Sequence, residues 1–352
     1  MSDAPHGFRC ALVATLAGAG RWVCLLGLGS VAAGVSAQTG TDLLTDPWWA
    51  GQHAAVEADF LGQSAGEVDG GADQDARIFI GRTRTRLRLG PASAAAPADA
   101  PRPAALGHEY THVDFDSDDP RVPRRLVRQE LALGLPLPEQ DWAGQTWRPG
   151  LVLGVGHSSF NPFGDGQAWY PLASVFAQRN LADGATLPLG VSFDGNRSVL
   201  PDTPLPIFEY RRPFGPADGE AELGITLGYP ESRLIYRPNR RLTLSAGFDR
   251  LDWATAELRY QATDTLGLHL AYAAFYDMFH AADDPDDRRL YFLSQRLEAG
   301  VVLTIAPRCD LLLAAGYAFG QELRRGYDWR STDPVLEFDD APLARVGLAW
   351  SF

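Results

Sequence analysis

The sequence predicts an all-β fold, namely a closed antiparallel transmembrane β-barrel of about 14 strands, within a range of roughly 12 to 16. Three observations predict it. An export leader opens the chain, apolar and polar residues alternate through the C-terminal half, and the last strand ends in phenylalanine. The 352 residues have a mean hydropathy of -0.15 and contain no run of about 18 apolar residues, which excludes a bundle of membrane-spanning helices.

Composition and charge narrow the class further. Hydrophobic residues make up 45% of the chain and charged residues 21%, which is typical of a folded protein. The formal net charge is -13, whereas a nucleic-acid-binding protein normally presents a basic face. We therefore expect no nucleic-acid partner.

Residues 1–37 have the composition of a cleaved signal peptide. Arg9 and Arg21 precede a stretch from Trp22 to Val35 that is rich in leucine, glycine and alanine, and small residues continue to Ala37. A basic start, an apolar middle and a small-x-small end are what signal peptidase recognises. The sequence therefore predicts export and cleavage after Ala37.

Cleavage would leave a mature chain that begins at Gln38. We expect a periplasmic N-terminal segment over residues 38–52 and the outer-membrane barrel over residues 53–352. The mature chain keeps only Cys309, so it can form no internal disulfide. Its stability must come from the sheet and from packing.

Strands in the C-terminal half show a period of two residues. Apolar side chains occupy one face, and polar or small side chains occupy the other, in Arg241–Asp249, Trp253–Gln261, Leu290–Ile305 and Asp310–Glu322. In a membrane barrel the apolar face contacts lipid and the other face lines the interior. We expect Leu244, Leu258, Val301, Leu313 and Leu348 to face lipid, and Ser245, Thr255 and Gly316 to face inward.

Connections between these strands favour a membrane barrel over a soluble sandwich. Tight turns such as Pro238–Arg240 interleave with longer polar connections at Met278–Arg289 and Leu323–Ala341. Outer-membrane barrels have short turns at the periplasmic rim and long loops outside the cell. Strands of about 9 to 13 residues also match the tilted bilayer span of about 9 to 11 residues.

The last strand carries the most specific signal. Val346, Leu348, Trp350 and Phe352 alternate with small or polar residues up to the terminus. A terminal phenylalanine after such a run resembles the signature that outer-membrane barrels present to the barrel assembly machinery. These four residues are the predicted assembly signal, and the predicted location is the cell outer membrane, with its lipid and lipopolysaccharide as surroundings.

The N-terminal half is less regular. Val56–Phe60 and Phe79–Leu89 alternate clearly, and further candidate strands bring the total to as many as 16. Whether Ala221–Arg237 is a hairpin that turns at Pro230 or one bulged strand stays open, because proline at a strand end fits either. The alanine- and proline-rich stretch Gly90–Ala105 reads as a connection.

Three stretches resemble a known family. Leu200–Pro206, Gly228–Pro230 and Arg233–Arg237, together with the closing strands, are similar to a family of Gram-negative outer-membrane β-barrel proteins of unknown function. The resemblance covers roughly residues 75 to 352 and is strongest over 200–352. It implies the barrel fold and the outer-membrane location, and it implies no catalytic residues.

Arg82, Arg84, Arg86 and Arg88 form a ladder on one face of one predicted strand. Each would cost roughly 2 to 4 kcal/mol if it faced lipid near the bilayer midplane, so the ladder must face the lumen. Two alternatives stay open. The ladder could line an open channel, or it could pair with Glu57, Asp59 and other carboxylates and fill a closed barrel.

Three other groups of polar residues point to chemistry less strongly. The first, His108, Tyr110, His112, Asp114 and Asp116, shares one strand face, where we expect a hydrated lumen or loop base, because alternate strand residues are about 6.6 to 6.8 Å apart and the two histidines cannot share one ion. His157, Ser159 and Asn161 resemble the His-x-Ser arrangement of outer-membrane lipid A deacylases, but no acidic residue follows at matching spacing. The acidic residues Asp283, Asp284, Asp286, Asp287, Asp339 and Asp340 are expected to be solvated loop charges.

A passive channel or transporter for small solutes is the leading functional prediction. The alternative is a structural or surface-interaction barrel with a plugged lumen, and a membrane lipid hydrolase comes third. We expect no enzymatic activity, no catalytic or metal-binding residues and no cofactor.

Overall fold

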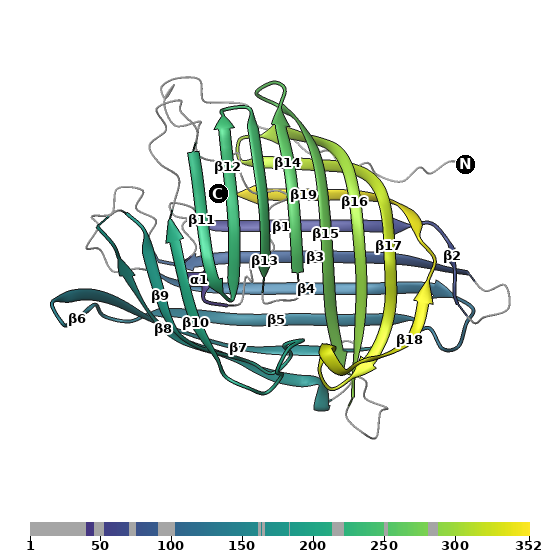
Figure 1. The fold of residues 1–352 in the computed structure, drawn as a ribbon, viewed down its shortest axis with the longest axis horizontal. Helices are drawn as coiled ribbons and strands as arrows, with labels where there is room; N and C mark the ends of the chain where they lie inside the picture. Colours follow the sequence, from purple (N-terminus) through teal and green to yellow (C-terminus); the bar gives the residue numbers. More distant parts are fainter. Residues whose placement is uncertain are drawn as a thin grey trace, which may run out of the picture.

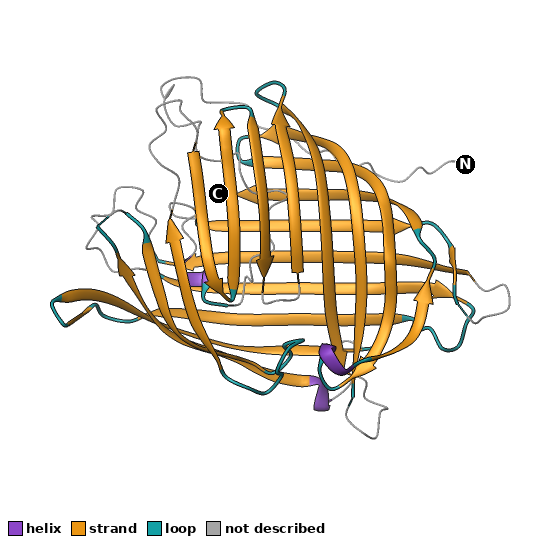
Figure 2. Ribbon diagram, viewed as in Figure 1, coloured by secondary structure: helices purple, strands orange, loops and turns teal. Residues whose placement is uncertain are grey.

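The computed structural model describes residues 40–45, 53–69, 75–90, 103–160, 163, 166–182, 184–212, 222–249, 253–280 and 288–352. The predicted signal peptide lies outside these residues. Strands dominate the described chain (Figure 2), and its helices are α1 (Asp42–Thr45) and two short 3-10 turns, η2 (Gly166–Ala168) and η3 (Trp329–Ser331). None of the described helices has the length and apolar character needed to cross a membrane.

A closed antiparallel β-barrel of 16 strands forms the wall. Each strand pairs with its neighbour in the chain, and the pairing of β1 with β19 closes the ring. The number of strands is the upper limit of the predicted range. The wall strands are β1 (Ala54–Gln63), β3 (Asp75–Leu89), β4 (Ala104–Ser117), β5 (Arg125–Pro136), β7 (Gln145–Ser159), β8 (Trp169–Asn180), β9 (Thr186–Asp194), β10 (Leu205–Arg212), β11 (Glu222–Tyr229), β12 (Glu231–Asn239), β13 (Leu242–Asp249), β14 (Trp253–Gln261), β15 (Leu266–His280), β16 (Arg289–Ala306), β17 (Cys309–Gly326) and β19 (Ala341–Ser351).

Three short strands extend the sheet beyond the wall. They are β2 (Gly66–Glu67) beside β3, β6 (Gln140–Trp142) beside β7, and β18 (Asp333–Phe338) beside β17. The structure also settles the question left open at Pro230, because β11 and β12 form a hairpin around it. This hairpin and the weakly patterned β9 account for the strands beyond the expected number of about 14.

The outer surface of the wall is apolar, as the alternation predicts. Leu258, Leu313 and Leu348 are 39%, 40% and 37% exposed. In contrast, the residues that flank Leu258 in β14, Glu257 and Arg259, are buried. Gly316 has the inward orientation predicted for it. However, a Cβ at this position would lie 2.1 Å from the carbonyl oxygen of Leu297, so no larger residue fits there.

Both ends of the barrel can be defined from the strand directions. The start of β1 and the end of β19 meet at one end, called the terminal end, where the amides of His53 and Ala54 donate to the carbonyl of Phe352 at 2.7 and 2.9 Å. The opposite end is called the far end. Gly90–Ala105, of which residues 91–102 lie outside the described chain, connects strands at the terminal end.

The barrel is flattened. In Figure 1 the strands β11 to β16 cross in front of β1, β3, β4 and β5 at a steep angle. Strand β15 also lies against β5 and β7, although β7 is half of the ring away from it. Opposite parts of the wall therefore meet inside the barrel, and the interior is narrower than the number of strands suggests.

Candidate functional site

The arginine ladder of β3 points into the barrel. Arg82, Arg84 and Arg86 are 7%, 7% and 4% exposed, and Arg88 on the same face is partly buried. The alternate residues of β3, including Phe79 with 46% of its surface exposed, face outward. The ladder therefore faces inward, as expected from the cost of placing arginine side chains in lipid.

Carboxylates from other strands pair with this ladder. Arg82 Nη2 lies 2.6 Å from Asp277 Oδ2 on β15, and Asp277 is fully buried. Arg84 lies 3.9 Å from Glu57 on β1 and 3.8 Å from Glu109 on β4. Among the described residues, Arg82 and Arg84 of the ladder are therefore paired with carboxylates, as the second of the two alternatives expects.

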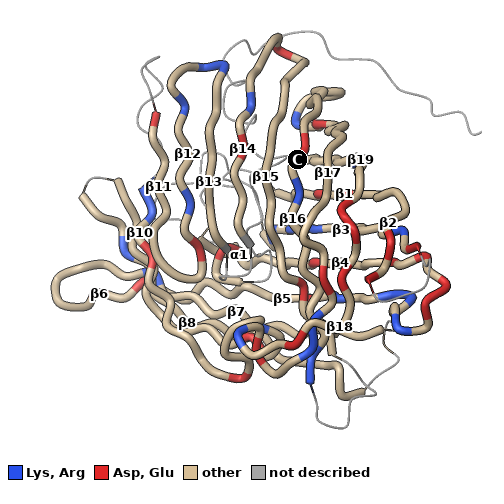
Figure 3. The backbone as a smooth tube through the Cα atoms, turned by 45° about the vertical axis from the view of Figure 1, so that its right-hand side comes forward, with Lys and Arg blue, Asp and Glu red and all other residues tan. Residues whose placement is uncertain are grey.

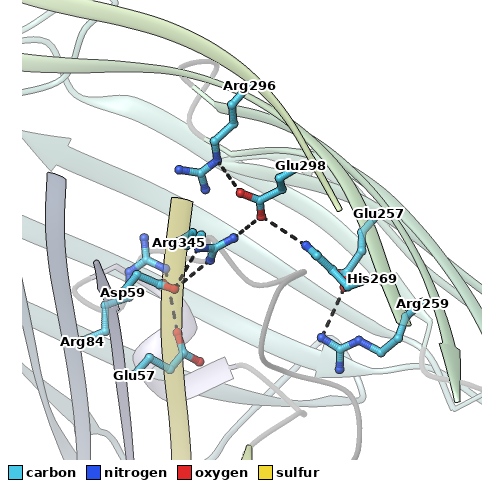
Figure 4. Close-up of polar contacts among 9 residues, drawn as sticks. All are labelled: Glu57, Asp59, Arg84, Glu257, Arg259, His269, Arg296, Glu298 and Arg345. Atoms are coloured by element: carbon cyan, nitrogen blue, oxygen red, sulfur yellow. Dashed lines mark hydrogen bonds and ion pairs between the residues drawn. The ribbon is translucent and has the colours of Figure 1, made fainter. Parts of the chain in front are cut away.

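The ion pairs continue around the wall toward β14 (Figure 4). Arg345 on β19 donates to Asp59 on β1 at 2.8 Å and also binds Glu298 on β16. Glu298 in turn lies 3.5 Å from Arg296 and 3.1 Å from the Nε2 atom of His269 on β15. We call this set the interior belt; it comprises Glu57, Asp59, Arg82, Arg84, Glu109, Arg128, Glu257, Arg259, His269, Asp277, Arg296, Glu298 and Arg345.

His269 is held between two carboxylates. Its Nδ1 atom lies 3.0 Å from Glu257, its Nε2 atom lies 3.1 Å from Glu298, and its side chain has no exposed surface. A neutral imidazole has one N–H, and an ionised carboxylate only accepts hydrogen bonds. If both ring nitrogens of His269 form a hydrogen bond to Glu257 and Glu298, the three side chains together hold one proton more than a neutral histidine and two ionised carboxylates hold.

Charges of both signs are interleaved in the barrel (Figure 3), and this interleaving keeps buried charge compensated. Taking one ion out of water costs several kcal/mol, and a buried charge left without its partner destabilises a protein by about 3 to 5 kcal/mol. The ion pairs of the belt join opposite charges, as for Arg128, which lies 3.0 Å from Glu109 and 3.5 Å from Asp277. The belt thus fixes the wall as well as filling the lumen.

A dry cluster closes the interior on the far side of the belt. Ile78 and Ile80 precede Arg82 on β3, which starts at the far end, and the ring of Phe275 lies 4.8 Å from the Arg82 guanidinium carbon. An apolar layer of this kind excludes water and hydrated ions. The cluster comprises Leu61, Val68, Ala76, Ile78, Ile80, Val113, Phe115, Val122, Leu126, Phe275, Phe279, Leu290, Phe292, Ala318, Leu323, Leu336, Phe338 and Leu343.

The connection between β9 and β10, residues 195–204, folds against other strands at the far end, and we call it the strap. Asn196 Nδ2 donates to the Met278 carbonyl at 3.2 Å. The Ser198 carbonyl accepts from the amide of Trp329 at 3.1 Å, and the Leu200 amide donates to Asp328 at 3.0 Å. Residues 196–199 are buried, so the strap packs as part of the molecule at this end.

The strap has two charged contacts. Its own Asp202 pairs with Arg289 on β16 at 3.1 Å, and its Leu200 amide donates to Asp328. The hydrogen bonds from the Arg330 side chain, and then those from the backbone amides of Arg330 and Leu200, lower the pKa of Asp328 to about 2. Arg330 Nη2 lies 2.6 Å from Asp328 Oδ2. The carboxylate is therefore ionised at every physiological pH and keeps accepting from the strap.

Helix α1 fills the terminal end of the interior. Leu43 is fully buried and packs against inward side chains of five wall strands, namely Ala105, Ala132, Val152, Phe176 and Ile207. Arg211 on β10 donates to Asp42 and, at 2.8 Å, to Thr45 Oγ1. Residues 40–45 therefore lie inside the barrel, and they belong to the stretch 38–52 that the sequence assigns to a periplasmic N-terminal segment.

The histidines of β4 do not face the lumen. The inward residues of β4 include Glu109, Thr111 and Val113, so His108 and His112 face outward, contrary to the expected hydrated lumen. Outward orientation follows from the register, since His112 is paired with Gly81 on the outer face of β3. Among the described residues, no three side chains of His, Cys, Asp or Glu are arranged to hold a metal ion.

His157 and Ser159 share the outward side of β7 with Leu153 and Val155 but are buried, with 0% and 2% exposure. The ring of His157 packs against Phe163 and Trp169, with ring centroids 5.8 and 5.0 Å apart. Asn161 and the acidic residues Asp283, Asp284, Asp286 and Asp287 lie outside the described residues, whereas Asp339 and Asp340 are exposed.

The predicted assembly residues line up on the outer face of β19. Val346, Leu348, Trp350 and Phe352 are all exposed, and the rings of Trp350 and Phe352 are 4.8 Å apart. This outer row is accessible along the seam that closes the barrel.

Several belt residues were missed by sequence reasoning. Asp277, Glu298, Arg296 and Arg345 each occupy an inward position of a strand whose other face is apolar. The alternation identifies these positions one strand at a time, but it does not say which strands meet across a flattened barrel.

No protein-family model matches the chain, and no curated protein matches it in sequence. Solved structures that match in shape include an outer membrane channel from Pseudomonas putida F1, at 11% identity and a TM-score of 0.35, covering 86% of this chain and 96% of that one. The translocator domain of the autotransporter NalP from Neisseria meningitidis matches at 12% identity and a TM-score of 0.29, covering 88% and 91%. The β domain of the Bordetella autotransporter BrkA matches at 11% identity and a TM-score of 0.27, covering 85% and 100%.

Proposed function

We propose that the protein is an outer-membrane β-barrel whose lumen is closed at rest and opens as a gated conduit for small solutes. The carrying observation is that the interior holds a charged belt between two closures built partly from segments outside the wall. These segments are α1 at the terminal end and the strap at the far end. The proposal replaces the passive channel expected from sequence.

The belt supports a conduit because charge is expensive inside a protein. A structural barrel could fill its lumen with apolar side chains, and replacing buried ion pairs by such side chains is often neutral or stabilising. Here the ladder and its partners keep a charged path between the closures. Lipid and lipopolysaccharide would surround the barrel, and the barrel assembly machinery would insert it.

Planar-bilayer recording tests the proposal. The wild-type barrel should show no conductance steps. A variant that lacks residues 42–45 and carries Asp328→Asn should conduct, because the two segments outside the wall that hold the closed state are weakened and the wall strands carrying the dry cluster can then separate. In that open variant, replacing the ladder by glutamine should move the reversal potential toward cations, since a row of one sign focuses the field. Steps from the wild type would overturn the closed resting state.

The second candidate is a structural or surface-interaction barrel. The dry cluster favours it, because this closure is made of wall side chains such as Phe275 and Phe292 and cannot be removed with a loop. If the doubly weakened variant is folded and still silent, the structural role replaces the conduit.

A lipid hydrolase is the weakest of the three roles. A serine nucleophile needs a base within about 3 Å and an access route for its substrate. The ring of His157 packs against Phe163 and Trp169 on the outer wall, and Ser159 is buried. We expect His157→Ala and Ser159→Ala to leave lipid A acylation unchanged.

A further inference from the structure

The part of the barrel interior that α1 contacts combines a buried cation with an apolar surface, as a site for an amphiphilic ligand would. One buried cation, Arg211, stands at the edge of an apolar strip at the terminal end of the lumen. We propose that this α1 site binds an amphiphile with a carboxylate head and an apolar chain, of the fatty-acid class, and that Asp42 and the two leucines after it occupy the site as a built-in competitor. This inference rests on the proposed resting state, which it deepens by naming a ligand class.

Arg211 provides the head-group part of the site. It is 4% exposed, and its Nε donates to Glu209 at 2.8 Å. Its two Nη atoms serve α1, since Nη1 donates to Thr45 at 2.8 Å and Nη2 donates to Asp42 as well as to Glu209. When α1 leaves, these two donor contacts lose their acceptors, and a buried donor left without an acceptor is unfavourable. A carboxylate restores both, because guanidinium groups bind carboxylates with two N–H donors.

The wall beside Arg211 provides the part for the chain. Leu43 and Leu44 lie against Ala105, Ala132, Val152, Phe176 and Ile207. Two glycines make room for Leu44, since a Cβ at Gly134 would lie 2.9 Å from its Cγ and a Cβ at Gly150 would lie 3.2 Å from its Cδ1. Small inward residues on three adjacent strands thus form a strip that accepts methyl and methylene groups.

Local charge favours a displaceable occupant. Glu209 remains bound to Arg211 and also accepts from the Glu231 amide at 3.1 Å, so the wall side of the guanidinium is neutralised without α1. Arg233 pairs with Glu231 at 2.7 Å. The wall pairs Glu209–Arg211 and Glu231–Arg233 are already balanced in charge, so Asp42 is an additional anion at this site. An external carboxylate can take its place without a change in net charge.

Thiol labelling measures the release of α1 directly. Thr41 is 2% exposed, so Thr41→Cys in a Cys309→Ser background gives a thiol that reacts with a maleimide only when α1 leaves. The barrel is reconstituted in liposomes and treated with the maleimide in the presence of octanoate, octanol or octylamine. These three probes are used below their micellar concentrations. Octanoate should accelerate labelling, and octanol and octylamine should do so far less.

Two variants separate recognition from folding. Asp42→Asn removes the competing carboxylate and leaves Arg211 in place, so the octanoate concentration for half-maximal labelling should fall about tenfold, in keeping with one charged hydrogen bond. Arg211→Gln should abolish the difference between octanoate and octanol. Arg212→Gln, at the adjacent exposed position, is the matched control and should behave as wild type.

Equal effects of octanoate and octanol on the Asp42→Asn barrel would overturn the proposal, and so would an unchanged half-maximal concentration. Labelling does not depend on conductance. A conducting wild type would therefore end the closed resting state and leave the ligand site intact, whereas a silent wild type without octanoate-specific labelling would do the reverse.

Discussion

Single residues of the belt matter here because the charges they compensate have no access to solvent. Glu298 is 2% exposed and is shared by Arg345, Arg296 and His269. Its carboxylate thereby links three strands on one side of the lumen, because His269 lies on β15, Arg296 on β16 and Arg345 on β19. Loss of this one negative charge affects three cationic partners at once.

Glu298→Gln should therefore destabilise the barrel by about 3 to 5 kcal/mol, the cost of leaving buried charge without its partner. Urea unfolding of the reconstituted barrel, followed by tryptophan fluorescence, measures it. Glu337→Gln on the exposed face of β18 is the control and should stay within about 0.5 kcal/mol of wild type. Equal stabilities of the two variants would mean that water, not Glu298, compensates these cations.

At the scale of elements, the strap links the β9–β10 end of the wall to strands that are distant in sequence. It contacts β15 through Asn196 and the turn after β17 through Ser198 and Leu200. The sequence marks residues 200–206 as turn punctuation by their prolines, but it does not show that the preceding residues are buried. Burial comes from partners such as Met278 and Asp328, which are remote in sequence.

Docking of the strap should depend on pH only in strong acid. The pKa of Asp328 is lowered to about 2 in the fold from an ordinary value of 3.8, so its contribution is complete above about pH 4 and is lost as the pH falls through about 2. Arg330→Gln removes the main cause of this shift and should move the loss to higher pH. Hydrogen exchange of the Leu200 amide, corrected for intrinsic rates, measures it, with Arg241→Gln as the control at the other end.

For that measurement, the decisive comparison is between the two variants. If Arg330→Gln and Arg241→Gln show the same pH profile at Leu200, Asp328 does not hold the strap. A profile that shifts only in Arg330→Gln assigns the docking to this carboxylate.

At the scale of the whole molecule, the sequence predicts the wall better than its contents. Alternation predicts the closed barrel, the outward Leu258 and the inward Arg82, because each depends on one strand and its surroundings. The partner of Arg82, Asp277, lies 195 positions away and depends on how the barrel flattens. The entry of α1 into the lumen was missed for the same reason, since its short stretch of leucines shows no period.

Closure of the barrel depends on Phe352 in two separable ways. Its backbone accepts from His53 and Ala54 and donates to the Ala54 carbonyl at 2.9 Å, which joins the last strand to the first. Its ring is 48% exposed on the outer face beside Trp350, where the assembly machinery could recognise it. Deleting Phe352 removes both features, whereas Phe352→Ala removes the ring alone.

We expect both variants to reduce the amount of folded barrel in the outer membrane, because both lack the exposed ring that we propose as the sorting signal. After refolding from urea into liposomes, which requires no assembly machinery, Phe352→Ala should regain nearly wild-type stability, and the deletion should not, because its seam has lost three backbone hydrogen bonds. Fractionation and urea titration of the two variants measure these outcomes. If Phe352→Ala assembles normally in cells, the ring is no sorting signal, and the terminal residue acts only through the seam.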